Sequence, residues 1–314
     1  MKEAFESVVE KRFSCMDNCP LNETGKGFHA LLKDPDSCGQ IGSVTTPRGL
    51  KPLLRFSPTG NFVPDPYVIV CGKTADKSTQ KNFWDQSRSG DPPIAAHEMI
   101  FSTESTRNTL YKELIVIGLF DLLRKVKPDV WEGLADEEGW NRLFQGDKWQ
   151  ENYGIQLTQA CNCAIIRTEK NKYTSEVKMI AKEPTRSMGR ALAAKNPSCL
   201  FNSFPDPDRL TNLKLVIFLD TPPFKKSRGE WRSFHQVDFF DNSELGMAYK
   251  RKDINIISIP HPSGFSYRHT DPISVYEKYD SDEKQTDEDK RAAELLHKAK
   301  AMIDEITKNI EETR

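Results

Sequence analysis

Four short apolar runs, most of them rich in β-branched residues, are the feature that most constrains this sequence. They lie at about Tyr67–Cys71, Gln156–Arg167, Leu213–Leu219 and Ile254–Ile259. Each run ends in a polar or Gly/Pro-containing loop, and long, partly helical segments separate them. Runs that are apolar on both faces predict buried strands, and strands that alternate with helices favour a parallel sheet. The sequence therefore predicts an α/β fold with a central, mostly parallel four-stranded sheet flanked by helices.

The segments around these runs predict one domain and a tail. The domain is expected over residues 1–278, and its first part, 1–65, is rich in Gly, Pro, Asn, Asp and Ser from residue 20 onward. That composition predicts an irregular N-terminal arm laid over the core. A polar loop is expected from residue 72 to about 100, and residues 129–153 show no periodicity that assigns them a conformation.

Two helices are predicted from apolar spacing. The first covers about 105–126, with Ser105 or Thr106 as its N-cap. The tail begins with a charged linker at 279–290, and residues 291–314 then place their apolar side chains on one stripe. Three outcomes are open for this amphipathic helix: it packs on its own domain, forms a self-association contact, or docks a partner.

The charge balance limits the kind of partner. The 314 residues include 45 Lys+Arg and 46 Asp+Glu, which argues against non-specific wrapping of nucleic acid. Acidic residues gather in the linker and at 129–151, whereas basic residues follow the third and fourth runs, so a DNA site must be local. These basic residues are Lys225, Lys226, Arg228, Arg232 and Arg268, with His269 beside them.

Hydropathy predicts a cytoplasmic protein without a membrane partner. The mean hydropathy is −0.63. No apolar run approaches the length of about 18 residues that a membrane-spanning helix needs, and the N-terminus has no apolar signal-peptide core.

The seven cysteines are odd in number and scattered, so a disulfide framework is not expected. Those in apolar runs, Cys71, Cys161 and Cys163, predict buried thiols. Cys15 and Cys19 differ, because they form a C-x3-C pair beside a proline in a stretch without periodicity. That setting favours metal ligation over core packing.

The sharpest single motif is a histidine held between two prolines directly after the fourth run. His261 lies where ligands bind in parallel sheets, outside the carboxyl ends of the strands. Ser263 and Gly264 follow it with a hydroxyl and backbone N–H groups suited to a phosphate. The alternative is that His261 only occupies a turn that the prolines fix.

The order of the motifs resembles the uracil-DNA glycosylase superfamily, especially its iron–sulfur branches. That family has a strand ending in a Gly-containing catalytic loop, a Phe element with a Leu-rich helix, a strand with T-N-x-x-K-C, a further apolar strand, and a strand ending in H-P-S. The series here is VIVCGKTAD (68–76), IFSTESTRNTLYKELIVIGL (100–119), LTQACNC (157–163), LKLVIFLD (213–220) and ISIPHPSG (257–264). The resemblance spans about residues 10 to 275, and the order is more specific than any one motif.

The resemblance implies a role for individual side chains. His261 would stabilise the departing base, Phe101 would stack on the flipped base with support from Arg107, and Gln159 or Asn162 would read the base edge. Lys73 and Thr74 would line the base pocket, with Lys73 a phosphate contact or, as a less favoured alternative, an amine nucleophile. The implied DNA contacts are Ser263, Gly264, Arg268, Lys225, Lys226 and Arg228, with Phe265 or Tyr267 as a wedge.

The departures from the family bear on substrate and cofactor. The first-loop carboxylate is displaced by three residues to Asp76, with Asp85 a more distant substitute. The loop is also longer, and Gln159 replaces an asparagine, so a modified base is expected in place of uracil. Four cysteines, Cys15, Cys19, Cys163 and Cys199, occupy places analogous to the family's [4Fe–4S] ligands, although their spacing is looser. A zinc ion or free buried thiols are the alternatives.

The sequence thus predicts a DNA glycosylase that flips out a modified, non-canonical pyrimidine and hydrolyses its N-glycosidic bond, in repair or anti-phage defence. The alternative is a catalytically inactive DNA-binding protein of the same fold. A third hypothesis, an unrelated α/β hydrolase, lacks the G-x-S-x-G elbow that would support it.

Overall fold

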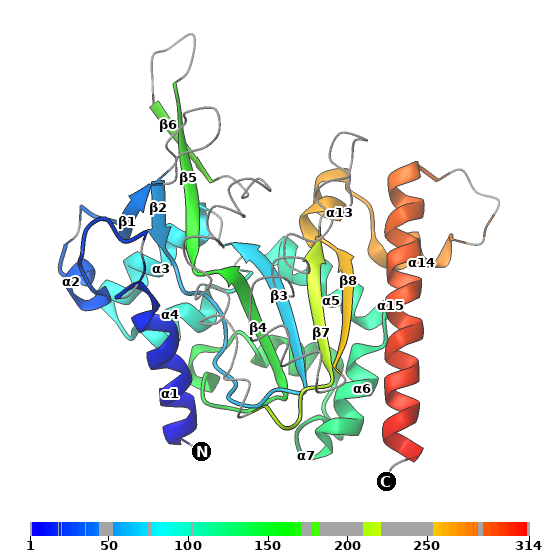
Figure 1. The fold of residues 1–314 in the computed structure, drawn as a ribbon. Coiled ribbons are helices and arrows are strands. Elements are labelled where there is room, and N and C mark those ends of the chain that lie inside the picture. Colours follow the sequence, from blue (N-terminus) through cyan, green and yellow to red (C-terminus); the bar gives the residue numbers. More distant parts are fainter. Residues whose placement is uncertain are drawn as a thin grey trace.

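The computed structural model describes residues 2–17, 19, 21–34, 36–43, 53–74, 77–101, 103–170, 177–181, 210–220, 254–279, 281 and 285–312. A four-stranded, all-parallel sheet in the order β4-β3-β7-β8 forms its centre (Figure 1). Its strands are β4 (Ile155–Cys161), β3 (Val68–Thr74), β7 (Leu215–Asp220) and β8 (Asn255–Pro260). This sheet and its flanking helices confirm the predicted fold class.

Side chains on the two faces of the parallel sheet enter different clusters. On β3, Val68 and Val70 belong to the main hydrophobic core, whereas Ile69 and Cys71 belong to a smaller cluster on the opposite face. Burial in that cluster raises the pKa of the Cys71 thiol. The main core also contains Ile257 and Ile259 of β8, and residues of β4 and β7. One face of the sheet therefore packs against the main core across all four strands.

Helices cover the main-core face of the sheet. They are α5 (Glu104–Val116), α6 (Leu119–Val126), α7 (Pro128–Trp131), α8 (Asp136–Arg142), α13 (Pro262–Arg268), α14 (Pro272–Glu277) and α15 (Asp287–Glu312). The single helix predicted over 105–126 is interrupted at Gly118, whose φ of +76° lies in the left-handed region that favours glycine. Its N-cap is Thr103, which accepts from the Thr106 N–H, so the predicted cap was two to three residues late.

The C-terminal helix packs on its own domain. α15 contacts β8, α6 and α14, and it stands at the β8 edge in Figure 1. Its buried side chains include Ala292, Leu296, Ala299, Ile303 and Ile306. All five belong to the apolar stripe that the sequence predicts within residues 291–314. The helix begins at Asp287, inside the predicted linker, where the Asp289 N–H donates to the Thr286 hydroxyl at 3.1 Å.

A second sheet was not predicted. It is antiparallel, in the order β1-β2-β5-β6, with β1 (Gln40–Ser43), β2 (Leu53–Phe56), β5 (Cys163–Lys170) and β6 (Val177–Ala181). The one strand predicted over 156–167 is therefore two strands in two sheets, β4 and β5. The chain changes sheets at Asn162, whose carbonyl accepts from the Ser57 N–H at 2.6 Å.

The N-terminal arm and the first loop are more ordered than predicted. The arm contains α1 (Lys2–Phe13), the short 3₁₀ helix η1 (Ser14–Met16) and α2 (Phe28–Leu32), and the loop contains α3 (Lys77–Ser89) and α4 (Pro92–Glu98). We call the cluster they form with β2 the aromatic cluster; its rings are Phe5, Phe13, Phe28, Phe56, Phe62, Phe83 and Trp84. The irregular-arm and polar-loop predictions were wrong there because each of these elements gives the cluster only a few buried apolar residues, too few for a visible periodic pattern.

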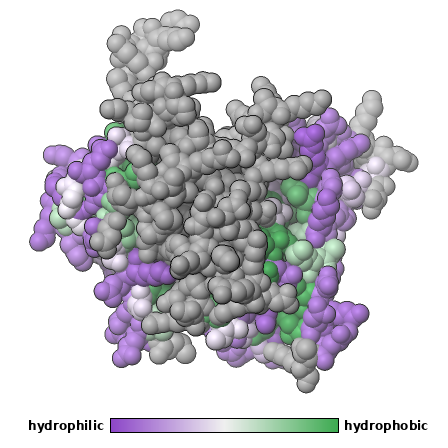
Figure 2. Space-filling view, viewed as in Figure 1, coloured by the Kyte–Doolittle hydropathy of each residue, from purple (hydrophilic) through white to green (hydrophobic). Residues whose placement is uncertain are grey.

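Residues 129–153, to which the sequence assigned no conformation, join the main core. They form α7, α8 and the 3₁₀ helix η2 (Gly146–Lys148), and they bury Trp131 and Trp140. Figure 2 shows hydrophilic residues over the described outer flanks of one face. In the described part of the chain, Ile115 and Tyr279 are the exposed large apolar residues. No helix of that part has the length and apolarity needed to span a membrane.

Candidate functional site

The carboxyl edge of the parallel sheet brings predicted site residues onto one face. Gly72 pairs with Gln159 across β3 and β4, and both continue the alternation of side chains that face the main core. His261 continues the same alternation after Ile259 on β8. β7 separates β3 from β8, so the two ends are about 10 Å apart. Ligands of parallel sheets bind at this kind of edge.

Gln159, Gly72 and Phe101 pack closely at the floor of this candidate site. A Cβ atom on residue 72 would lie 2.5 Å from Gln159 Oε1 and 3.0 Å from Phe101 Cε1, so only glycine allows this approach. Gln159 is 5% exposed, and its Oε1 has no hydrogen-bond partner in the described chain. A buried carbonyl oxygen without a donor is unfavourable, so the site is suited to a ligand that supplies an N–H group. Gly72 was not predicted as a site residue, although a glycine ending a buried strand is a known sign of close approach.

Phe101 is held in a strained backbone conformation. Its φ is +46°, uncommon for an aromatic residue, and it is 7% exposed. The guanidinium of Arg107 fixes this turn: its Nε donates to the Phe101 carbonyl at 3.0 Å and its Nη2 to the Glu98 carbonyl. The Arg107 guanidinium also lies over the Phe144 ring, 4.1 Å from the ring centre. Burial lowers the pKa of Arg107. Arg107 thus lies where it supports Phe101, as the resemblance implied.

The turn after β8 sets the orientation of the His261 ring. The Ser263 N–H donates to His261 Nδ1 at 3.2 Å, and the Ser263 hydroxyl lies 2.8 Å from the same nitrogen. Because Nδ1 accepts a backbone N–H, the proton of the neutral ring is on Nε2. The His261 carbonyl accepts from the Gly264 N–H at 2.8 Å, and Pro262 begins α13 at a position where proline is preorganised. The two N–H groups expected to grip phosphate are therefore bonded to His261 instead.

Two predicted DNA contacts are engaged inside the fold. Phe265 is fully buried in the main core, so it offers no wedge. Arg268 pairs through Nη1 with Asp289 of α15 at 2.7 Å and donates from Nε to the Gly264 carbonyl at 3.0 Å. Its guanidinium carbon also lies 5.3 Å from the centre of the Phe265 ring. Arg268 thus joins the His261 segment to the C-terminal helix, a role that sequence spacing gave no reason to expect.

Asn162 follows the carboxyl end of β4, but its side chain and three of the cysteines face the aromatic cluster and not the floor formed by Gln159. Asn162 is fully buried, and its Nδ2 lies 3.6 Å from Cys15 Sγ, so it is not placed to read a base beside Gln159. Cys15 and Cys163 belong to the aromatic cluster, and Cys19 packs against it. In the described ranges, no group of three His, Cys, Asp or Glu side chains is arranged to hold a metal ion. A [4Fe–4S] cluster stays a prediction, because Cys199 lies outside those ranges.

Several other predicted residues also lie outside the described chain. Asp76, Lys225, Lys226, Arg228 and Arg232 are among them, and of Lys73, Thr74 and Tyr267 only the backbone is described. Lys73 and Thr74 form the end of β3, level with the candidate site. Asp85, the alternative carboxylate, lies on α3 and pairs with Lys81 at 2.7 Å on the exposed surface.

Comparison with protein-family models, curated proteins and solved structures finds no match to this chain. The similarity to the uracil-DNA glycosylase superfamily therefore stays a prediction that depends on the order of the motifs.

Proposed function

We propose that this protein is a DNA glycosylase that flips out a modified, non-canonical pyrimidine and hydrolyses its N-glycosidic bond, leaving an abasic site. The observation that carries the proposal is the packing of Gln159 against Gly72 and Phe101, with a buried Oε1 that has no donor in the described chain. A flipped base has an aromatic face that can stack on Phe101 and hydrogen-bonding edges that can donate to Gln159 Oε1.

Each of four residues, of which the structure describes the first three, has one task in the proposed reaction. Phe101 stacks on the flipped base, and Gln159 Oε1 accepts an N–H of its edge. Breaking the bond leaves negative charge on the departing base, which His261 stabilises from Nε2 as a hydrogen-bond donor. Asp76 is the proposed carboxylate that orients water and offsets the positive charge on the sugar.

The proposed setting is the cytoplasm, and the partner is DNA. The near-neutral charge of the chain, −1, fits a short footprint with few phosphate contacts. Excision of modified bases serves either repair or defence against phage DNA, and the identity of the base decides between them.

An abasic-site assay tests the proposal. End-labelled duplexes that carry uracil or bulky modified pyrimidines are incubated with the protein, treated with alkali and separated by size. His261→Ala is expected to lower the rate by about 10²–10³-fold, the usual cost of losing one preorganised donor to a developing anion. Gln159→Ala and Asp76→Asn are expected to lower it as well, and Asp129→Asn, which removes an exposed carboxylate on α7, is the matched control.

Binding without release of any base would overturn the enzymatic proposal in favour of an inactive DNA-binding protein. Release that persists unchanged in Gln159→Ala would show that the floor residue does not face the base. Release unchanged in Asp76→Asn alone would remove that residue from the mechanism and leave the class of reaction intact.

A further inference from the structure

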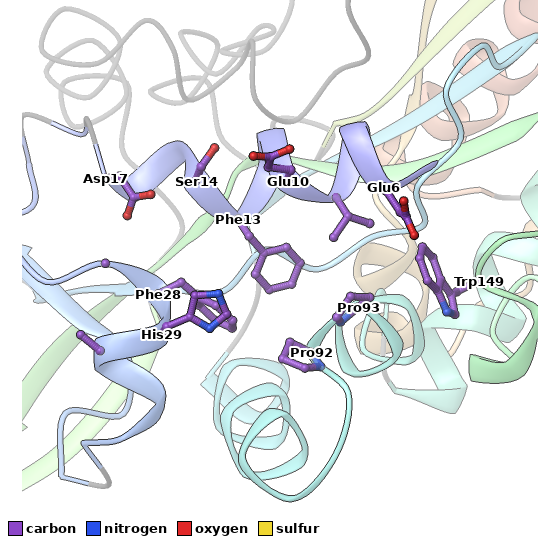
Figure 3. A pocket seen from close by; sticks show the side chains of 13 residues that line it. Glu6, Glu10, Phe13, Ser14, Asp17, Phe28, His29, Pro92, Pro93 and Trp149 are labelled. Carbon is purple, nitrogen blue, oxygen red and sulfur yellow. The ribbon is translucent and has the colours of Figure 1, made fainter. Parts of the chain in front are cut away.

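A groove of about 750 Å³ lies between α1 and the facing segments α2 and α4 (Figure 3). Its lining is mostly apolar. Figure 3 shows the Phe13 ring pointing from α1 into the groove, with Phe28 to one side, Trp149 to the other, and Pro92 and Pro93 opposite. Such a volume is typical of sites for small molecules.

Carboxylates of α1 and of the turn after η1 line this groove. They are Glu6, Glu10 and Asp17, all three are exposed, and no Lys or Arg is among the described residues that line it. Glu6 and Glu10 are one turn apart on α1, about 6 Å along its axis, and Asp17 follows η1 beyond the end of that helix. Lys2 reaches Glu6 at 3.8 Å, but both side chains are more than half exposed, so this pair is weak.

The opposite wall does not favour an anion. Helix N-termini ordinarily attract anions through their unbonded N–H groups. α4 begins with Pro92 and Pro93, neither of which has an N–H to donate. The ring nitrogens of His29 and Trp149 are side-chain donors in the lining, but among its described residues three carboxylates face no Lys or Arg, which favours a positively charged ligand.

We propose that this groove binds a linear aliphatic polyamine of the spermidine class. The ammonium groups of such a molecule are separated by three or four methylenes, a spacing comparable to the helical turn between Glu6 and Glu10, so two of them can pair with these residues while the third extends toward Asp17. Its methylene stem lies on the rings of Phe13, Phe28 and Trp149, where aromatic faces also attract the charged ends. The proposal does not rest on the proposed function, because this acidic groove repels the phosphates of DNA.

Isothermal titration of nucleic-acid-free protein with spermidine at low salt tests this proposal. We expect saturable binding at one site. Glu10→Gln is expected to weaken it by about threefold to fivefold, since one charge pair on an exposed surface is lost. Glu10→Gln combined with Asp17→Asn should weaken it by roughly tenfold or more. Glu3→Gln, an equal charge change on the exposed first turn of α1 outside the groove, is the matched control and should leave the affinity unchanged.

A second variant tests the apolar part. Ala30 lines the groove from α2 and is exposed, so Ala30→Trp fills the space without changing any charge. It should block spermidine while the melting temperature stays near that of the wild type. Three results would overturn the proposal: no saturable binding, equal loss in Glu3→Gln and Glu10→Gln, or displacement of spermidine by equimolar Mg²⁺. Binding of a lysine-rich peptide without binding of spermidine would also overturn it, by making the groove a peptide site.

Discussion

The main core beside the parallel sheet and the aromatic cluster under the N-terminal arm are built from different side chains. The main core is largely aliphatic, drawn from every strand of the parallel sheet and the helices on it. The aromatic cluster gathers one or two rings from each of several elements, among them Phe13 of α1, Phe28 of α2 and Trp84 of α3. Periodic aliphatic residues are visible in a sequence, whereas one or two rings in an otherwise polar helix are not. The difference explains why one half of the fold was predicted and the other was not.

Both regions leave some buried polar groups without a partner in the described chain, among them His97 on α4 and Glu113 in the main core. Trp84 Nε1 in the aromatic cluster donates to the Phe56 carbonyl at 2.7 Å. In the main core, Glu113 is fully buried on α5 with neither carboxyl oxygen bonded in the described chain, and Gln159 Oε1 is likewise without a donor. Unsatisfied buried groups are expected where a fold gives up stability for function.

Removing Trp84 should have the largest effect on stability. The ring is 1% exposed and packs directly on Gly39, where a Cβ would lie 2.1 Å from its Nε1, so deleting it leaves a large cavity beside a residue without a side chain. Trp84→Ala is expected to lower the free energy of unfolding by about 3–5 kcal/mol. Urea unfolding followed by circular dichroism measures this, with Leu114→Ala on α5 as the matching deletion in the main core. A two-step transition in Trp84→Ala alone would show that the aromatic cluster unfolds separately.

Acid should weaken the protein through a buried histidine on α4. Both ring nitrogens of His97 lack partners in the described chain, and burial, aided by the charge of Arg107, lowers its pKa to about 4. The unfolded chain binds this proton near its ordinary pKa of 6.5, so stability falls as the pH drops from 6.5 to 4. The expected loss is about 3 kcal/mol.

The measurement is the urea midpoint as a function of pH, compared between wild type and His97→Gln. The variant should have the shallower profile between pH 6.5 and 4. Parallel profiles would show that His97 becomes protonated in the folded protein at its ordinary pKa.

The parallel sheet was predictable because each of its strands is short, apolar and bounded by loop residues. The same rules failed at Asn162, where one apolar run serves two sheets, because the bend depends on a bond from the distant Ser57 N–H. They failed again at Gly118, where the glycine was read as part of a continuous helix although it ends one and begins another. Tertiary contacts decide both positions, and local patterns do not contain them.

Replacing Glu113 should stabilise the protein. Burial raises the pKa of its carboxyl well above the ordinary value of 4.5. The unfolded chain therefore releases this proton at a lower pH than the folded chain, and stability falls as the pH rises above 4.5. Glu113→Gln keeps the shape and removes the ionisable group, so we expect a gain of about 1–3 kcal/mol at pH 7 and almost none at pH 4. A loss at pH 7 would mean that the carboxylate is ionised and paired.

In the candidate site, as in the fold, some features were predictable from the sequence and others depend on tertiary contacts. His261, Phe101 and Gln159 follow recognisable strand ends or motifs, and the sheet brings them to one edge and one face. Phe265 and Arg268 follow the same motif, but their contacts come from the main core and from α15, more than twenty residues away in the case of Asp289. Sequence spacing therefore predicted which residues come to this edge of the sheet and could not say which of their neighbours face outward.

A change in the Arg268–Asp289 pair should have the smallest effect on stability, and it tests how α15 holds the segment that contains His261. Both side chains are mostly buried, at 19% and 13% exposure, and Asp289 also accepts from the Thr286 hydroxyl at 2.7 Å. Asp289→Asn keeps an acceptor and removes the charge, so a charge-assisted bond becomes a neutral one of roughly half its strength. We expect a loss of about 1 kcal/mol, with faster amide hydrogen exchange in α13 than in β8. Asp304→Asn is the control, because Asp304 pairs only with the exposed Lys300 on the same helix in the described chain. Equal effects of the two variants would mean that α15 holds the His261 segment through its apolar stripe alone.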